Sequence, residues 1–155
     1  MLFRSEPAGG QWNYDVENRG TFPKAGPGKL PAPVRFAPDK TTRGVIDLVN
    51  SRFASHPGSL DDFDWPVTPA DARAALDDFL AHRLAHFGRY QDAIWTAQPW
   101  LYHSRLAQAM NMKLLDPRDV VAAAEKLYRA GKAPLEATEG FIRQVIDWQI
   151  GRAHV

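Results

Sequence analysis

The residue whose position most suggests chemistry is Ser104, which precedes a short stretch with helical spacing that ends near Met112. We expect residues 104–112 to form a short helix with Ser104 near its start. A helix N-terminus presents unpaired N–H groups and a partial positive charge, so it suits a phosphate group. Serine at such a position can also serve only as a helix cap. The residues by themselves leave both interpretations open.

No other set of polar residues forms a recognisable catalytic or metal-binding pattern. His82 and His86 are four residues apart and could lie on one helix face, but no third ligand accompanies them. The acidic stretch from Asp61 to Asp64 lacks the spaced ligands and the glycine of a calcium loop. The sequence also lacks a Ser/His/Asp triad, a Cys/His pair and a Gly-rich phosphate loop. We therefore predict no metal site.

Size and composition indicate one ordinary domain. The chain has 155 residues, of which 45% are apolar and 24% charged. Its formal net charge of +1 gives no general electrostatic reason to bind nucleic acid, so such binding would need a local patch. No run approaches the roughly 20 apolar residues of a membrane span, and we expect a cytoplasmic location. The absence of cysteine excludes disulfides and thiolate ligands within these residues.

The first part of the chain is rich in glycine and proline. Prolines fix φ and remove backbone donors too often here for a regular element, at Pro23, Pro27, Pro31, Pro33 and Pro38. We interpret residues 6–40 as an interdomain linker. A segment of this length is unusual at the start of a compact domain, which suggests that another domain precedes it.

Residues 41–149 show helical spacing and no alternating strand pattern, so we predict an all-α domain. The apolar face of its first helix contains Val45, Ile46, Val49 and Phe53. The second helix is expected to begin at Thr68-Pro69 and to end before Gly88. Another should begin at Asp116-Pro117 and end at Gly131. The last should extend from about residue 136 to residue 148.

The two ends look like translated sequencing adapter. The codons CTC TTC CGA TCT encode Leu2-Phe3-Arg4-Ser5, and their reverse complement encodes the end of Gln149 followed by Ile150-Gly151-Arg152. Such an inverted repeat has no reason to occur in a protein domain. We expect residues 1–5 and 150–155 to be artefacts and exclude them from fold reasoning.

Four stretches together resemble the photolyase/cryptochrome family, namely residues 87–93, 103–107, 113–121 and 139–148. The most similar branch contains bacterial iron-sulfur proteins that repair (6-4) lesions. The resemblance implies the N-terminal part of a helical FAD-binding domain and light-dependent repair of UV pyrimidine lesions by electron transfer from reduced FAD. A cryptochrome-like blue-light photoreceptor is an alternative. A cofactor-free helical interaction module is a third possibility.

The resemblance also implies roles for particular residues. In this family, the stretch that matches residues 103–107 holds the FAD diphosphate, which implies FAD contacts for His103, Ser104, Arg105, Leu106 and Ala107. Ala107 replaces a family serine, so it could contribute only its backbone. Lys113 replaces the glycine that usually precedes Leu-Leu in the family.

Two further residues match functional positions of the family. Tyr90 matches an aromatic position near the flavin. Gln144 matches the Glu or Gln that hydrogen-bonds the flipped lesion, a tentative catalytic role. UV-damaged DNA is the implied partner, and no obligate protein partner is implied. The iron-sulfur cluster and the antenna chromophore of the family would have their sites outside these residues, and we expect the isolated chain to be inactive.

Overall fold

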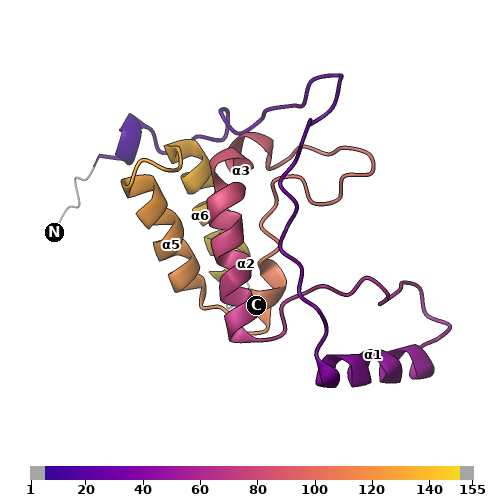
Figure 1. Ribbon diagram of the computed structural model, residues 1–155. Helices are drawn as coiled ribbons and strands as arrows, with labels where there is room; N and C mark the ends of the chain where they lie inside the picture. The colour runs from indigo at the N-terminus through magenta and orange to yellow at the C-terminus, as the bar shows by residue number, and fades with distance from the viewer. Residues whose placement is uncertain (1–5, 151–155) are drawn as a thin grey trace.

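The computed structural model describes residues 6–150, and all regular structure within them is helical (Figure 1). The predicted all-α class is therefore confirmed for this part of the chain. The elements are η1 (Ala8–Gly10), α1 (Lys40–Arg52), α2 (Pro69–His82), α3 (Leu84–Tyr90), α4 (Ala107–Asn111), α5 (Pro117–Arg129) and α6 (Leu135–Ile150). The adapter-like ends lie outside the described residues, except for Ile150. No helix within residues 6–150 is both long and apolar enough to cross a membrane.

The hydrophobic core lies among α2, α3, α5 and α6. Three aromatic rings meet at its centre: Phe79 from α2, Phe87 from α3 and Phe141 from α6, with ring centroids 4.8 to 5.9 Å apart. All three side chains are buried. Burial of such large apolar side chains is the main stabilising contribution in a domain of this size.

The ends of α5 follow the sequence signals closely. The Asp116 carboxylate accepts a hydrogen bond from the Arg118 amide at 2.8 Å, and proline occupies the first helical position. At the other end, Gly131 has a φ of 68°, and its amide donates to the carbonyl of Tyr128. The Lys132 amide donates to the carbonyl of Leu127, which completes a Schellman motif. Both predicted boundaries of this helix are confirmed.

The expected single helix from residue 68 to residue 88 is wrong, because the chain breaks at Arg83. This residue has a φ of −127° and separates α2 from α3, so Gly88 lies inside α3. Arg83 is only 1% exposed, and its guanidinium donates to Asp78 at 2.6 Å. Burial lowers the pKa of Arg83, and the Asp78 charge opposes this effect. The buried ion pair therefore forms where the helix axis changes.

Residues 11–39 form an irregular strap that follows the helices (Figure 1). Asn18 is buried and donates a hydrogen bond to the carbonyl of Glu136 at 2.9 Å. The Gly20 amide donates to the carbonyl of Arg89 at 2.8 Å. Farther along, Val34 and Phe36 pack against the core. The interdomain role of residues 6–40 stays a prediction, but the strap is closely attached to the helices.

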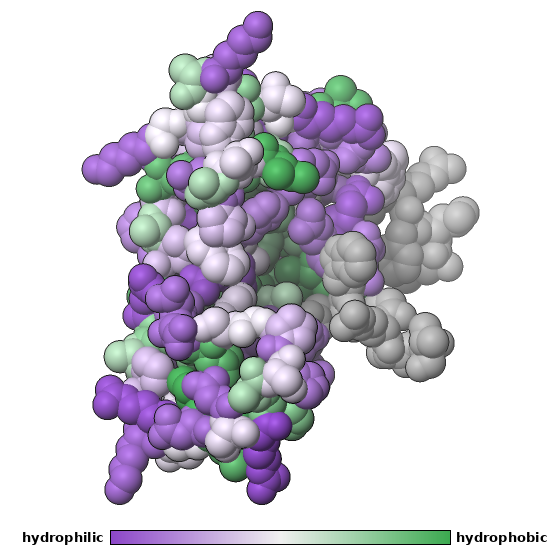
Figure 2. Space-filling view, turned by 90° about the vertical axis from the view of Figure 1, so that its right-hand side faces the viewer, coloured by the Kyte–Doolittle hydropathy of each residue, from purple (hydrophilic) through white to green (hydrophobic). Residues whose placement is uncertain are grey.

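Helix α1 differs from the other helices because it buries no residue. It lies to one side of the bundle in Figure 1, and hydrophobic side chains are visible at the surface in the lower part of Figure 2. Val45, Leu48 and Phe53 are 54%, 47% and 50% exposed. Of the predicted apolar face, Val45 and Phe53 are exposed, whereas Ile46 and Val49 are half-buried, so the described residues cover it only in part.

The close contact between α3 and α6 can be tested at Gly88, which lies in α3. A Cβ atom on Gly88 would lie 2.5 Å from the Ala137 Cα and 2.5 Å from the Asn18 Oδ1. We expect Gly88→Ala to lower the free energy of unfolding by about 1–3 kcal/mol, because α3 and α6 would have to separate. The measurement is urea unfolding followed by circular dichroism. Gly44→Ala in α1 is the matched control, since open space surrounds it, and it should raise stability by up to about 1 kcal/mol. Equal effects of the two substitutions would contradict the packing.

Candidate functional site

Residues 103–106 form a loop that leads into α4, which corrects the expected helix start. Helix α4 begins at Ala107, so Ser104 lies three residues before it. Arg105 has a φ of 59°, outside the helical region, and therefore a helix cannot continue from Ser104. The Ser104 hydroxyl accepts a hydrogen bond from the Leu106 amide at 3.4 Å. Ser104 thus forms a local turn and does not cap a helix.

Arg105 is held by a clamp of two tryptophans and one carboxylate. Its guanidinium carbon lies 4.5 Å from the ring centroid of Trp65 and 4.0 Å from that of Trp100. Its Nη2 donates to Asp64 Oδ1 at 2.7 Å, and Arg35 binds the other oxygen of the same carboxylate. The positive charge of Arg105 is therefore paired with Asp64 within the protein. The clamp joins the loop before α2 to the loop before α4.

The inner side of this loop is closed. A cavity of about 10 Å³ lies beside Ser104 and Arg105 and also borders the buried Arg83. Such a volume holds about one water molecule. A diphosphate could therefore contact Ser104 only from the opposite side of the loop.

Two further residues of the segment, Leu106 and His103, are wholly or partly buried. Leu106 is 0% exposed and belongs to the core. His103 is half-buried, and its amide donates to the carbonyl of Trp100 at 2.8 Å. Burial lowers the pKa of His103, and the charge of Asp92 opposes this effect. The neutral imidazole is thus the favoured form in the folded protein.

Tyr90 lies at the end of α3 in a cluster of aromatic rings. Its ring stacks on Phe22 of the strap, with centroids 4.2 Å apart and planes inclined by 12°. It also stacks on Tyr102, at 5.5 Å, and burial raises the pKa of Tyr102. The ring of His86 lies 5.1 Å from Tyr102. Tyr90 is therefore in direct contact with Tyr102, the residue before His103.

Gln144 lies on α6 close to the same end of α3. It is half-buried, and its side-chain amide donates to the Gln91 side-chain oxygen at 3.3 Å. Because Gln91 directly follows Tyr90, the contact between α3 and α6 brings two predicted site residues into one region. His103 joins this region through Tyr102, whereas the guanidinium of Arg105 is held in its own clamp.

Two features of this region were not predicted. Asn18 is buried between α3 and α6, where a Cβ atom on Gly140 would lie 2.7 Å from its Nδ2. Gly140, inside the expected helix from residue 136 to residue 148, was the available signal, since an internal glycine often marks close packing. Lys113 has a φ of 63°, a conformation that glycine adopts without strain. Lys113 adopts this conformation in spite of its side chain.

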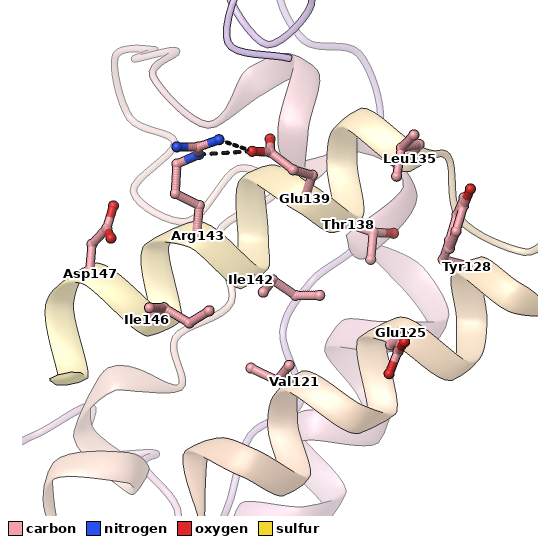
Figure 3. Close-up of a pocket in the computed structure, with 10 residues that line it drawn as sticks. All are labelled: Val121, Glu125, Tyr128, Leu135, Thr138, Glu139, Ile142, Arg143, Ile146 and Asp147. Atoms are coloured by element: carbon pink, nitrogen blue, oxygen red, sulfur yellow. Dashed lines mark hydrogen bonds and ion pairs between the residues drawn. The ribbon is translucent and has the colours of Figure 1, made fainter. Parts of the chain in front are cut away.

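The apolar groove in Figure 3 is separate from this region. It has a volume of about 600 Å³ and lies between α5 and α6. Its lining includes Val121, Ile142 and Ile146, and the Arg143 side chain donates to Glu139 at its edge. None of the predicted site residues lines it. Within residues 6–150, no group of three or more His, Cys, Asp or Glu side chains could hold a metal ion.

The clamp makes a prediction about stability. Arg105→Ala should lower the free energy of unfolding by about 2–4 kcal/mol, because the mostly buried Asp64 loses the buried one of its two arginine partners. Arg118→Ala is the control, since that arginine also pairs with an aspartate but its side chain is 91% exposed. The control should change stability by less than about 1 kcal/mol. Urea unfolding measures both, and similar losses would show that burial of the clamp contributes nothing.

The burial of His103 makes a prediction about pH. Unfolding restores its pKa towards the ordinary 6.5, so the unfolded chain binds more protons than the folded chain once the pH falls below that value. This contribution to stability is present above the ordinary pKa and is lost as the pH falls through the lower pKa of the folded protein. His103→Gln should therefore reduce the loss of stability between about pH 7.5 and pH 5. The exposed His56→Gln variant should keep the full loss of stability over this pH range. An unchanged pH profile in His103→Gln would show that the burial of His103 does not cause this loss.

Comparison with known proteins shows which proteins the chain is similar to. Residues 1–65 match the family model described as deoxyribodipyrimidine photo-lyase-related protein. Over 150 residues the chain is 47% identical to the (6-4) photolyase of Agrobacterium fabrum (strain C58 / ATCC 33970), a match that covers 96% of this chain and 29% of that protein. These matches identify the chain as a relative of the photolyase-related proteins that spans about 29% of the length of the curated photolyase it matches.

Proposed function

We propose that the chain is part of a light-dependent flavoprotein photolyase that repairs UV pyrimidine lesions in DNA, with (6-4) photoproducts as the lesion. The observation that carries this proposal is the 47% identity to a (6-4) photolyase over 150 residues. The matched family model supports it, because its description also names a deoxyribodipyrimidine photo-lyase.

FAD is the cofactor of the proposed activity, and when bound and reduced it would supply the electron transferred to the lesion. We assign its diphosphate to the segment from His103 to Ala107. The Ser104 hydroxyl is free to donate, because its one hydrogen bond in the described residues is accepted from an amide. Buried Leu106 anchors the loop, and Ala107 offers only its backbone. A hydroxyl and backbone amides suit phosphate oxygens, whereas the clamped Arg105 supplies positioning.

Two other residues of this region would contact the ligands: Tyr90 the flavin and Gln144 the lesion. Tyr90 would present an aromatic edge near the flavin, held in place by Phe22 and Tyr102. The amide of Gln144 is a directional donor and acceptor, which suits the polar edge of a base flipped out of the duplex.

The iron-sulfur cluster and the antenna chromophore belong to the proposal only as parts of a longer protein. The 155 residues contain no cysteine, so thiolate ligands for a cluster would have to come from elsewhere. The described residues likewise hold no enclosed cavity at the predicted FAD segment, since the space beside Ser104 is about 10 Å³. We therefore expect this chain alone to bind no stoichiometric flavin, and a yellow protein with one FAD per chain would contradict that.

A chimera tests the proposed function. Residues 6–147 replace the matching stretch of the Agrobacterium fabrum photolyase, and the purified protein is assayed for flavin absorbance and for blue-light repair of a (6-4) lesion. Ser104→Ala should weaken flavin retention by about tenfold, because one hydrogen bond to a charged phosphate is lost. Ala107→Ser should strengthen it, and Ser51→Ala on the exposed face of α1 should leave it unchanged.

The outcomes of the chimera experiment are separable. A folded chimera that lacks flavin and repair activity would refute the proposed function. A chimera that repairs lesions but retains flavin equally in all three variants would refute the diphosphate assignment of residues 103–107.

A further inference from the structure

We propose that residues 19–43, termed the basic segment, form a surface that binds the phosphate backbone of DNA. This inference rests on the proposed function and adds a surface to it. Six of the 19 Lys and Arg residues lie in this segment, but only one of the 18 Asp and Glu residues does. The segment therefore carries a formal charge of +5, and the other 130 residues carry −4. The near-zero net charge of the chain conceals this separation.

The cations of the basic segment are available to a partner. All six side chains are exposed: Arg19, Lys24, Lys29, Arg35, Lys40 and Arg43. Within residues 6–150, Lys24, Lys29 and Lys40 form no ion pair. Arg19 is paired with Asp15 at the surface, where such pairs contribute little energy and can exchange partners. Arg35 is paired with the mostly buried Asp64, but its own side chain is 67% exposed. Most of the positive charge is thus uncompensated.

The basic segment is held in a defined path. At its start the Gly20 amide donates to the carbonyl of Arg89 at 2.8 Å. Near its middle the Val34 amide donates to the Asp78 carboxylate at 3.2 Å, and the Phe36 amide donates to the carbonyl of Asp64 at 3.2 Å. The prolines between these points restrict φ further. Little ordering entropy remains to be lost on binding, which distinguishes this surface from a flexible basic tail.

The path of the basic segment brings its charge to the candidate site. Phe22 stacks directly on Tyr90, and a Cβ atom on Gly26 would lie 3.4 Å from the ring of Trp95. Lys24 lies between these two contacts in the sequence. A phosphate backbone bound there would therefore run past the end of α3 where Tyr90 and Gln144 are located. Backbone contacts of this kind position a duplex without reading its sequence.

The chemistry of the basic segment fits DNA better than a lipid surface. Between residues 19 and 39 it contains no helix and thus no amphipathic face, which interfacial membrane binding requires. Helix α1 adds an exposed apolar face beside Lys40 and Arg43, so anionic vesicles are the appropriate competing probe. Phosphate contacts by lysine release counterions, and this gives a characteristic dependence of affinity on salt.

The test uses this chain and a fluorescent duplex oligonucleotide without a lesion, with binding followed by anisotropy at several salt concentrations. The affinity should fall steeply with salt. Lys24→Glu combined with Lys29→Glu should weaken binding at least about tenfold at low salt and reduce the slope of log K against log salt by about 2. The control combines Lys126→Glu with Lys132→Glu, which changes the net charge equally at two exposed positions on and after α5. It should change the affinity by less than about threefold.

Three outcomes would overturn the inference: no salt-dependent binding by the unmodified chain, equal weakening by the two double variants, or binding to phosphatidylserine vesicles in place of the oligonucleotide. Circular dichroism confirms that the exposed substitutions leave the fold intact. The experiment needs no flavin, so its failure is distinct from failure of the chimera, which reports on the cofactor and on repair.

Discussion

The close contact between α3 and α6 is the constraint on which the rest of the structure depends. Gly88 allows it, because any side chain there would collide with Ala137 and with Asn18. The contact places Gln91 against Gln144 and so joins the end of α3 to the middle of α6. It also buries Asn18, which attaches the strap to the helices. One glycine thus determines both the candidate site and the path of the segment that precedes it.

The break at Arg83 is the second requirement of this arrangement. A continuous helix through residue 88 would carry Phe87 and Gly88 along the axis of α2. With the break, Phe87 meets both Phe79 and Phe141, and the core closes around three rings. The buried ion pair of Arg83 with Asp78 is tolerated because the carboxylate also accepts the Val34 amide. The ion pair and the apolar packing therefore support the same change of direction.

Local signals predicted the parts of the fold that local chemistry determines. Asp116-Pro117 and Gly131 define α5 because a cap, a fixed φ and a left-handed glycine act within one turn. The signals failed at Arg83, whose ion-pair partner Asp78 is five residues earlier, and at Arg105, whose partners are distant in sequence. Trp65 and Asp64 lie about 40 residues before Arg105, and no periodicity in residues 104–112 reveals them. The burial of Asn18 was missed for the same reason.

The clamp on Arg105 has a consequence for how an anionic partner can be bound. Arginine in a loop beside a serine would by itself suggest a phosphate ligand, but here two tryptophans and Asp64 already occupy the guanidinium. The loop can then offer a phosphate only hydroxyl and amide donors, which act at short range and in fixed directions. Long-range attraction of a polyanion must come from uncompensated charge, and the exposed lysines of the basic segment provide it. The two proposed roles are therefore carried by different residues, so a substitution in one should leave the other intact.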